Sequence, residues 1–238
     1  MALAQLPLFP LGTVLFPGLV LPLHVFEERY RALVRDLMDQ PADQARQFGV
    51  VAIQQGWEVE RQTRPDGAPV GSLAAAPVTL HDVGCTAELR QITERPDGRF
   101  DIVTVGRRRF RITSVDSESS PYLTAQIEYL DESIGEPGFA EHLAPRVLAS
   151  FRGYLGLVGP GSPATAEQLP EDPTVLSHLV AATAMLTLDE RQQLLAIPDT
   201  AARLRAELVI LEREAGLLRR VRAVPVPMSQ LAVPSSPN

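Results

Sequence analysis

Residues 6–38 have the sequence LPLFPLGTVLFPGLVLPLHVFEERYRALVRDLM, and this stretch decides the fold. Its first half, residues 6–25, carries no formally charged side chain, and prolines and glycines separate short apolar runs. Because proline cannot donate to a strand ladder and glycine favours turns, we predict short buried β segments joined by turns. From Phe26 onward apolar residues recur at helical spacing between charged ones, which predicts an amphipathic helix packed against a sheet.

Composition limits the kind of protein this can be. The chain has 238 residues, of which 45% are hydrophobic, enough for one sizeable core or two modest domains. Its net charge of −7 argues against a protein built mainly to hold nucleic acid or an anionic membrane. Cys85 is the single cysteine, so we predict no internal disulfide and no paired-cysteine zinc site, and we expect Cys85 to be buried.

Apart from the histidines, every basic side chain is an arginine, because the sequence contains no lysine. The chain therefore has no P-loop lysine, no Schiff-base lysine and no Ser–Lys dyad. The uncharged N-terminal stretch has no basic flank and is interrupted by four prolines, so it predicts neither a secretory signal nor a membrane span. We expect a cytoplasmic protein without a membrane partner.

The pattern after the first helix is extended. We predict strands over residues 48–55, 78–92, 99–115 and 122–130, with an exposed loop containing Trp57 between the first two. In the third strand the inward-facing residues change from odd to even numbers across Gly106, which predicts a bulge there. Gly84, inside the second strand, predicts a bulge or a close backbone approach. Several short antiparallel strands around one helix predict a small closed β barrel.

The remainder of the chain has a helical pattern. We predict a helix in residues 137–157 that begins or bends at Pro145, and helix N-termini capped by Asp172 and by Thr187. The expected fold class is α+β: a barrel domain with one packed helix over residues 1–131, an α-helical bundle domain over 132–222, and a disordered tail over 223–238.

No sequence motif for catalysis or for a cofactor is present. The chain lacks a nucleophile elbow, a zinc-protease helix, a dinucleotide-binding glycine pattern and a Walker A motif. The four histidines are far apart, and none has a partner at a spacing typical of metal ligands. We therefore predict no catalytic, cofactor-binding or metal-binding residues, and we expect no enzyme.

The strongest charge feature is GRRRFR at residues 106–111. Arginines beside an aromatic residue on a strand can contact phosphates and stack on bases, which makes Arg107, Arg109 and Arg111 candidates for RNA contact. The alternative is a bulged edge whose arginines pair with the excess of acidic side chains. The acidic net charge of the chain opposes RNA as a partner.

Three segments in order resemble the N-terminal, substrate-binding domain of Lon proteases: PLFPLGTVLFPG with LPLHVFEERYRALV, then VGCTAELRQITERPDGRFDIVTVGRRRFRI, then LTLDERQQLLAIPDTAARLRAELVILEREAGLL. The resemblance covers roughly residues 5–220 and implies a PUA-like β barrel followed by a helical bundle. In full-length Lon this domain helps to capture unfolded or damaged polypeptides for an ATPase ring and a protease. The chain resembles the stand-alone form of the domain, without the ATPase and protease domains, so the resemblance implies polypeptide binding rather than proteolysis.

Unfolded or exposed polypeptide segments are thus the expected partners, with a Lon-type protease or another protein as a further candidate. The candidate peptide-binding residues are His24, Phe26, Arg29 and Trp57. An apolar groove between the barrel and the helices, or addition of a peptide strand to an exposed sheet edge, would supply the affinity. Two alternatives stay open. His24, Glu28 and Arg29 can serve only to tie the strand to the helix start, and the arginine-rich strand can bind RNA.

Overall fold

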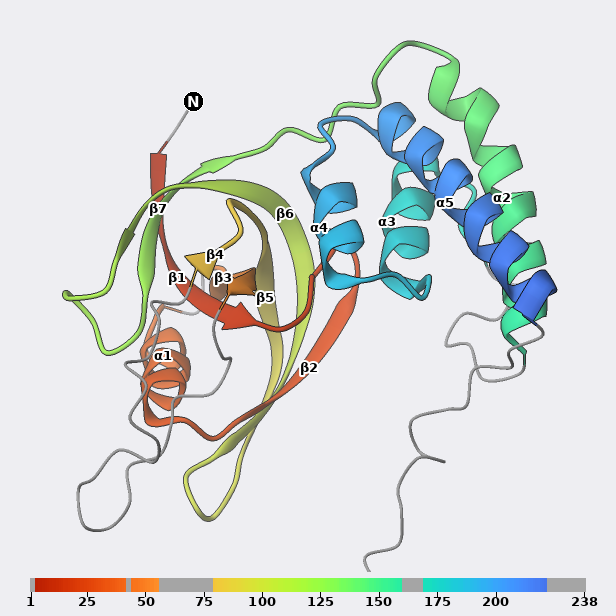
Figure 1. Cartoon of the computed structure of the whole chain (residues 1–238). Helices are drawn as coiled ribbons and strands as arrows, with labels where there is room; N and C mark the ends of the chain where they lie inside the picture. Colours follow the sequence, from red (N-terminus) through yellow and green to blue (C-terminus); the bar gives the residue numbers. More distant parts are fainter. Residues whose placement is uncertain (1–2, 42–43, 56–78, 160–168, 222–238) are drawn as a thin grey trace, which may run out of the picture. The chain divides into compact units, whose positions relative to one another are not determined.

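The computed structural model describes residues 3–41, 44–55, 79–159 and 169–221 (Figure 1). The predicted loop around Trp57 and the predicted tail at 223–238 lie outside these residues. In chain order the elements are β1 (Leu3–Leu11), β2 (Val20–Val25), α1 (Glu28–Met38), β3 (Gln47–Gln55), β4 (Thr79–Leu80), β5 (Val83–Glu94), β6 (Phe100–Asp116), β7 (Thr124–Tyr129), α2 (Phe139–Val158), α3 (Pro173–Thr183), α4 (Leu188–Ala196) and α5 (Thr200–Val221). The fold is therefore α+β. No helix in this part of the chain has the length and apolar character needed to cross a membrane.

The chain divides into two compact units. The first, called here the sheet unit, consists of Met1–Glu132 and Leu186–Pro198, and the second, the helical unit, of Ser133–Met185 and Asp199–Asn238. Helix α4, which lies inside the predicted helical domain, thus belongs to the sheet unit. The chain enters the helical unit twice, before and after α4.

Strand pairing in the sheet unit returns to the strand where it began (Figure 1). The order is β1-β7-β6-β5-β3, and β3 pairs in turn with β1. The β1–β3 pair is parallel and all other pairs are antiparallel. The sheet therefore closes on itself, and β2 and β4 extend it as side strands along β6 and β3.

Helix α1 contributes one face to the main core of the sheet unit. Tyr30, Leu33, Val34 and Leu37 are buried against apolar side chains of the strands. Burying each of these side chains contributes about 1.5–3 kcal/mol, whereas the charged residues on the other face stay exposed or half-buried. The predicted amphipathic helix is thereby confirmed.

The bulge predicted near Gly106 is also confirmed. The β5–β6 register shifts between Cys85 and Ala87, where β6 advances by one residue more than β5. In the bulge, the backbone N–H of Arg108 donates a 3.0 Å hydrogen bond to the hydroxyl of Thr86. This hydrogen bond occupies an amide that the interrupted ladder leaves without its regular partner.

In the helical unit, α2 begins at Phe139 and continues through Pro145. Of the two predicted alternatives, a helix start or a bend at Pro145, the start is therefore wrong. The proline lies one turn beyond Glu141, so the missing N–H affects only a carbonyl in the first turn of the helix. The predicted caps are confirmed: Asp172 accepts from the N–H of Val175, and Thr187 forms a complete capping box in the sheet unit.

Candidate functional site

Three of the four predicted peptide-binding residues lie at the turn from β2 to α1. His24 is near the end of β2, Phe26 follows the strand, and Arg29 is in the first turn of α1. His24 and Phe26 line a small hollow of about 70 Å³. The fourth candidate, Trp57, lies outside the described residues.

The floor of this hollow is apolar and firmly packed. It is formed by the buried side chains of Phe9, Leu11, Val25 and Tyr30. The rings of Phe9 and Tyr30 stack with centroids 4.0 Å apart and an interplanar angle of 12°. Phe26 lines the same hollow with 44% of its surface exposed, so a large apolar side chain is presented to solvent over an aromatic floor.

Polar side chains at and beside the hollow are paired with one another. Nδ1 of His24 lies 2.7 Å from Oδ1 of Asp101. Hydrogen bonds from His24 and then from Arg95 hold the pKa of the Asp101 carboxyl below its ordinary value. Arg29 pairs with Glu27 at 2.9 Å, and its guanidinium lies 4.6 Å from the centroid of Tyr30.

The polar cluster of His24, Glu28 and Arg29 considered from the sequence is arranged differently. Glu28 forms ion pairs with Arg31 and Arg35 along α1, whereas His24 and Arg29 have the partners described above. Each group thus has a partner of its own. The distinctive feature of the site is therefore its apolar surface.

Strand β2 adds a second feature beside the hollow. It pairs with β6 along one edge, and no other described strand pairs with it. Val20, Pro22 and His24 alternate as exposed residues along it, with 62% of Val20 exposed. Pro22 has no N–H to donate, which limits uncontrolled pairing at a strand edge.

The arginine-rich strand does not form one basic face. Arg109 is fully buried, which corrects its assignment as an RNA-contact candidate because its guanidinium has no exposed surface to offer a phosphate. Arg107 pairs with Glu88 at 2.5 Å. Arg111 is exposed and lines a different hollow, beside α4. The bulge explains part of this dispersal, because it changes which side chains of β6 point inward.

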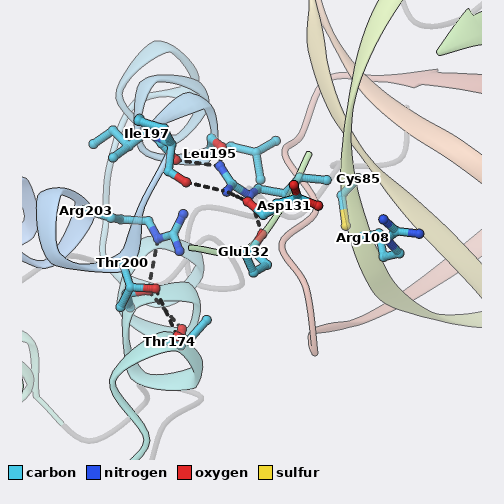
Figure 2. A network of polar contacts seen from close by, with 12 residues as sticks. Cys85, Arg108, Asp131, Glu132, Thr174, Leu195, Ile197, Thr200 and Arg203 are labelled. Atoms are coloured by element: carbon cyan, nitrogen blue, oxygen red, sulfur yellow. Dashed lines mark hydrogen bonds and ion pairs between the residues drawn. The ribbon is translucent and has the colours of Figure 1, made fainter. Parts of the chain in front are cut away.

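The guanidinium of Arg109 is instead the centre of a polar network, and its partners Glu132, Leu195 and Ile197 are labelled in Figure 2. It donates to the carbonyl oxygens of Leu195, Ile197, Pro198 and Asp131 and pairs with the carboxylate of Glu132. Three of those carbonyls belong to the C-terminal end of α4 and the residues just after it. The network therefore holds the end of α4 within the sheet unit.

Cys85 is buried as predicted, with 0% of its surface exposed. Burial raises the pKa of its thiol well above the ordinary value, so the reactive thiolate is disfavoured. Among the residues that the structure describes, no three histidine, cysteine or acidic side chains are grouped so that they could hold a metal ion.

Fold and surface together define an α+β protein whose closed sheet presents an apolar hollow beside a side strand. Residues 5–213 match the family model of the substrate-binding domain of the ATP-dependent protease La (LON). The chain therefore belongs to the LON substrate-binding domain family, as its sequence indicated.

Similar proteins include Lon proteases of several bacteria. The chain is 30% identical over 221 residues to Lon protease of Anaeromyxobacter dehalogenans, covering 91% of this chain and 24% of that protein. It is 26% identical over 218 residues to Lon protease of Escherichia coli K12, covering 90% of this chain and 25% of that protein. The chain thus spans about a quarter of the length of these relatives.

Two solved structures share the fold. The Lon N-terminal domain protein from Xanthomonas campestris gives a TM-score of 0.54 at 24% identity, covering 87% of this chain and 98% of that one. The N-terminal domain of the Mycobacterium avium complex Lon protease gives a TM-score of 0.62 at 17% identity, covering 90% and 98%.

Proposed function

We propose that this chain is a non-catalytic module that binds unfolded or exposed segments of polypeptide. Membership of a substrate-binding family supports a binding role. The observation that carries the proposal is Phe26, an aromatic side chain 44% exposed over a hollow with a buried aromatic floor. Exposed aromatic and aliphatic groups of this kind are typical of sites that bind apolar segments of a partner.

The size of the hollow favours a polypeptide over a small molecule. At about 70 Å³ it is well below the roughly 300 Å³ of an ordinary small-molecule pocket. It suits one aliphatic side chain of a longer ligand, whose neighbouring residues would extend along β2 past Val20. The outer edge of β2 offers backbone groups for such an extended segment, with Pro22 as an interruption.

We also propose a fold subclass for each unit and a cellular location. We assign the closed sheet to the PUA-like barrels, which the β1–β3 closure supports, and the second unit to the helical bundles. The proposed location is the cytoplasm, and a Lon-type protease is a candidate partner. The absence of lysine from the sequence supports a non-catalytic role, because a Lon-type Ser–Lys dyad and a P-loop both need one.

No observation on the described residues favours the RNA alternative. Of its three candidates, Arg109 is buried and Arg107 is paired with Glu88, while Arg111 lines a hollow that also contains acidic side chains. Polypeptide binding is therefore the function that we propose in preference to RNA binding.

The test is a fluorescence-anisotropy titration of a labelled unfolded polypeptide with the wild-type chain and the variants Phe26→Ser and Val20→Ser. Each variant removes one exposed apolar group, so we expect about three- to tenfold weaker binding for Phe26→Ser and a smaller loss for Val20→Ser. The matched control is Val115→Ser, which removes a valine that is 47% exposed on β6 and does not line the hollow.

The titration is repeated at low and high salt and with single-stranded RNA as competitor. Binding that tolerates salt and is not displaced by RNA supports capture through apolar contacts. Displacement by RNA with a steep loss of affinity in salt would overturn the proposal in favour of phosphate contacts. Equal affinities of wild type, Phe26→Ser and Val115→Ser would show that the hollow is not part of the binding surface.

A further inference from the structure

The helical unit contains a hollow of its own, which the proposed function does not use. This cleft of about 360 Å³ lies between the N-terminal half of α2 and the start of α3. Its lining is mostly apolar, with Leu148, Leu176 and three prolines among its residues. The two ionisable side chains in the lining are both acidic, Glu141 and Glu171.

Pro145 lines the cleft and lacks the amide hydrogen of a regular helical residue. An amide at position 145 would donate to the carbonyl oxygen of Glu141 in a regular helix, but proline has no N–H. The contribution of Glu141 to the lining that matters for a ligand is its carboxylate. Within the described residues, neither Glu141 nor Glu171 is held in an ion pair.

The start of α3 does not offset this acceptor character. Asp172 caps the helix and accepts the N–H of Val175 at 2.8 Å. Pro173, the first helical residue, has no amide hydrogen to offer. The amide of Val175 is thus capped and that of Pro173 is missing, and the negative carboxylate of Asp172 opposes an anionic ligand.

A ligand that fits this cleft needs an apolar stem and a cationic, donor-rich end. Arginine and lysine side chains have this form, because their methylene groups pack on apolar surface while the charged end meets carboxylates. We infer that the cleft binds a basic side chain of a partner polypeptide, with the stem against Leu148 and the prolines and the cation between Glu141 and Glu171. The inference rests on the proposed polypeptide binding only for the source of that side chain.

The net charge of −7 acts in the same direction over a longer range. It favours the approach of cationic segments, and this attraction weakens as salt is added. The cleft would thereby restrict the proposed ligands to segments that combine apolar residues with arginine or lysine.

The first experiment compares two labelled twelve-residue peptides that differ only in two arginines replaced by glutamine. Wild type is expected to bind the arginine peptide about three- to tenfold more tightly, as charge-assisted contacts allow. The double variant Glu141→Gln/Glu171→Gln should lose this preference and keep its affinity for the glutamine peptide. The control Glu212→Gln removes one exposed carboxylate on α5, outside the cleft, and should keep the preference.

An equal preference in wild type and in the double variant would overturn the inference. The outcome for Phe26→Ser separates it from the proposed function, because that variant should weaken both peptides and leave their ratio unchanged. If Glu141→Gln/Glu171→Gln alters only the ratio of the two peptide affinities and Phe26→Ser weakens both affinities equally, the cleft and the hollow beside β2 are separate binding sites.

A second measurement uses the full chain and no polypeptide. N-acetyl-arginine amide is titrated while the backbone amide signals are followed by NMR, and those of Leu148 and Leu176 are expected to shift in wild type and not in the double variant. If these signals shift but the chain binds no polypeptide, the proposed function is rejected and the cleft is still supported as a binding site for a basic side chain. Unmoved signals at saturating ligand would reject the cleft, whatever the peptides do.

Discussion

The guanidinium of Arg109 donates a 2.8 Å hydrogen bond to the carbonyl oxygen of Leu195, 86 residues further along the chain. Both residues belong to the sheet unit, although the helical unit begins between them in sequence. Four backbone carbonyls and the carboxylate of Glu132 share this one buried cation. Arg109 therefore helps to hold α4 in the sheet unit, together with the buried hydrogen bond from Gln192 to the carbonyl oxygen of Val83.

Replacing Arg109 with methionine keeps the stem and removes every donor. The acceptors around it then lose their partner in a buried environment, and we expect a loss of about 3 kcal/mol in the free energy of unfolding. Urea denaturation followed by circular dichroism measures the loss. The control is Arg107→Met, which breaks a partly exposed pair with Glu88 and should cost at most about 1 kcal/mol. Similar losses in the two variants would contradict the central role of Arg109.

Gly106 is expected to tolerate no side chain. Its N–H donates to the carbonyl of Leu19 at 2.8 Å, and a Cβ at this position would lie 2.2 Å from the carbonyl oxygen of Phe16. Since both contacts involve backbone, Gly106→Ala should destabilise the protein by about 1–3 kcal/mol. Gly153→Ala in α2 has the opposite expected sign, a gain of about 0.5–1 kcal/mol, because its Cβ would meet nothing within 4 Å. The two midpoints in urea should move in opposite directions, and a stable Gly106→Ala would contradict the close packing.

The sequence was informative wherever a signal is local. The parity change across Gly106 identified the bulge, because strand side chains alternate with period two. Gly84 predicted a close approach, and a Cβ there would lie 2.5 Å from the carbonyl oxygen of Val50. The capping box at Thr187 and the buried face of α1 depend on spacings of three or four residues. Each feature is decided within a few residues, so one sequence suffices.

The remaining features depend on contacts between distant residues. Nothing local distinguishes Arg109, which is buried, from Arg107 and Arg111, which are exposed. At the candidate site, His24 and Phe26 were identified from the polar cluster and the helix start. Asp101, the partner of His24, is 77 residues away and carried no signal of its own. Side-chain pairing of this kind is determined by which strands lie next to one another. The sequence pattern predicted a closed barrel but not the order or register of its strands.

The helical unit contains a buried acidic group that the apolar pattern of α5 did not predict. Glu207 is 1% exposed, and neither of its carboxyl oxygens has a hydrogen-bond partner among the described residues. Burial raises the pKa of Glu207 well above the ordinary value, and the charge of Arg203 opposes this shift only in part. The folded state thus holds this proton at pH values where the unfolded state has released it.

The raised pKa of Glu207 makes the folded protein less stable as the pH rises. Below the ordinary glutamate pKa both states are protonated, and as the pH rises from there the unfolded state loses its proton first, so stability falls. Between pH 5 and 7 we expect the free energy of unfolding of wild type to fall relative to Glu207→Gln, by up to about 1.4 kcal/mol per pH unit. Urea titrations at several pH values measure the difference. Glu212→Gln on the same helix should parallel wild type, and parallel curves for Glu207→Gln would disprove the assignment.

The only thiol of the chain offers a probe of the sheet unit. Cys85 is 0% exposed on β5, between strands β3 and β6, and burial raises the pKa of its thiol. A thiol reagent must therefore wait for the sheet to open, and opening a folded core costs several kcal/mol. We expect native labelling by a disulfide reagent at pH 8 to be at least about a thousandfold slower than in urea. Gly106→Ala and Arg109→Met should both label faster than wild type, since each destabilises the same unit. Rapid native labelling of wild type would instead show that β5 opens without global unfolding, and the closed sheet would then not be one cooperative element.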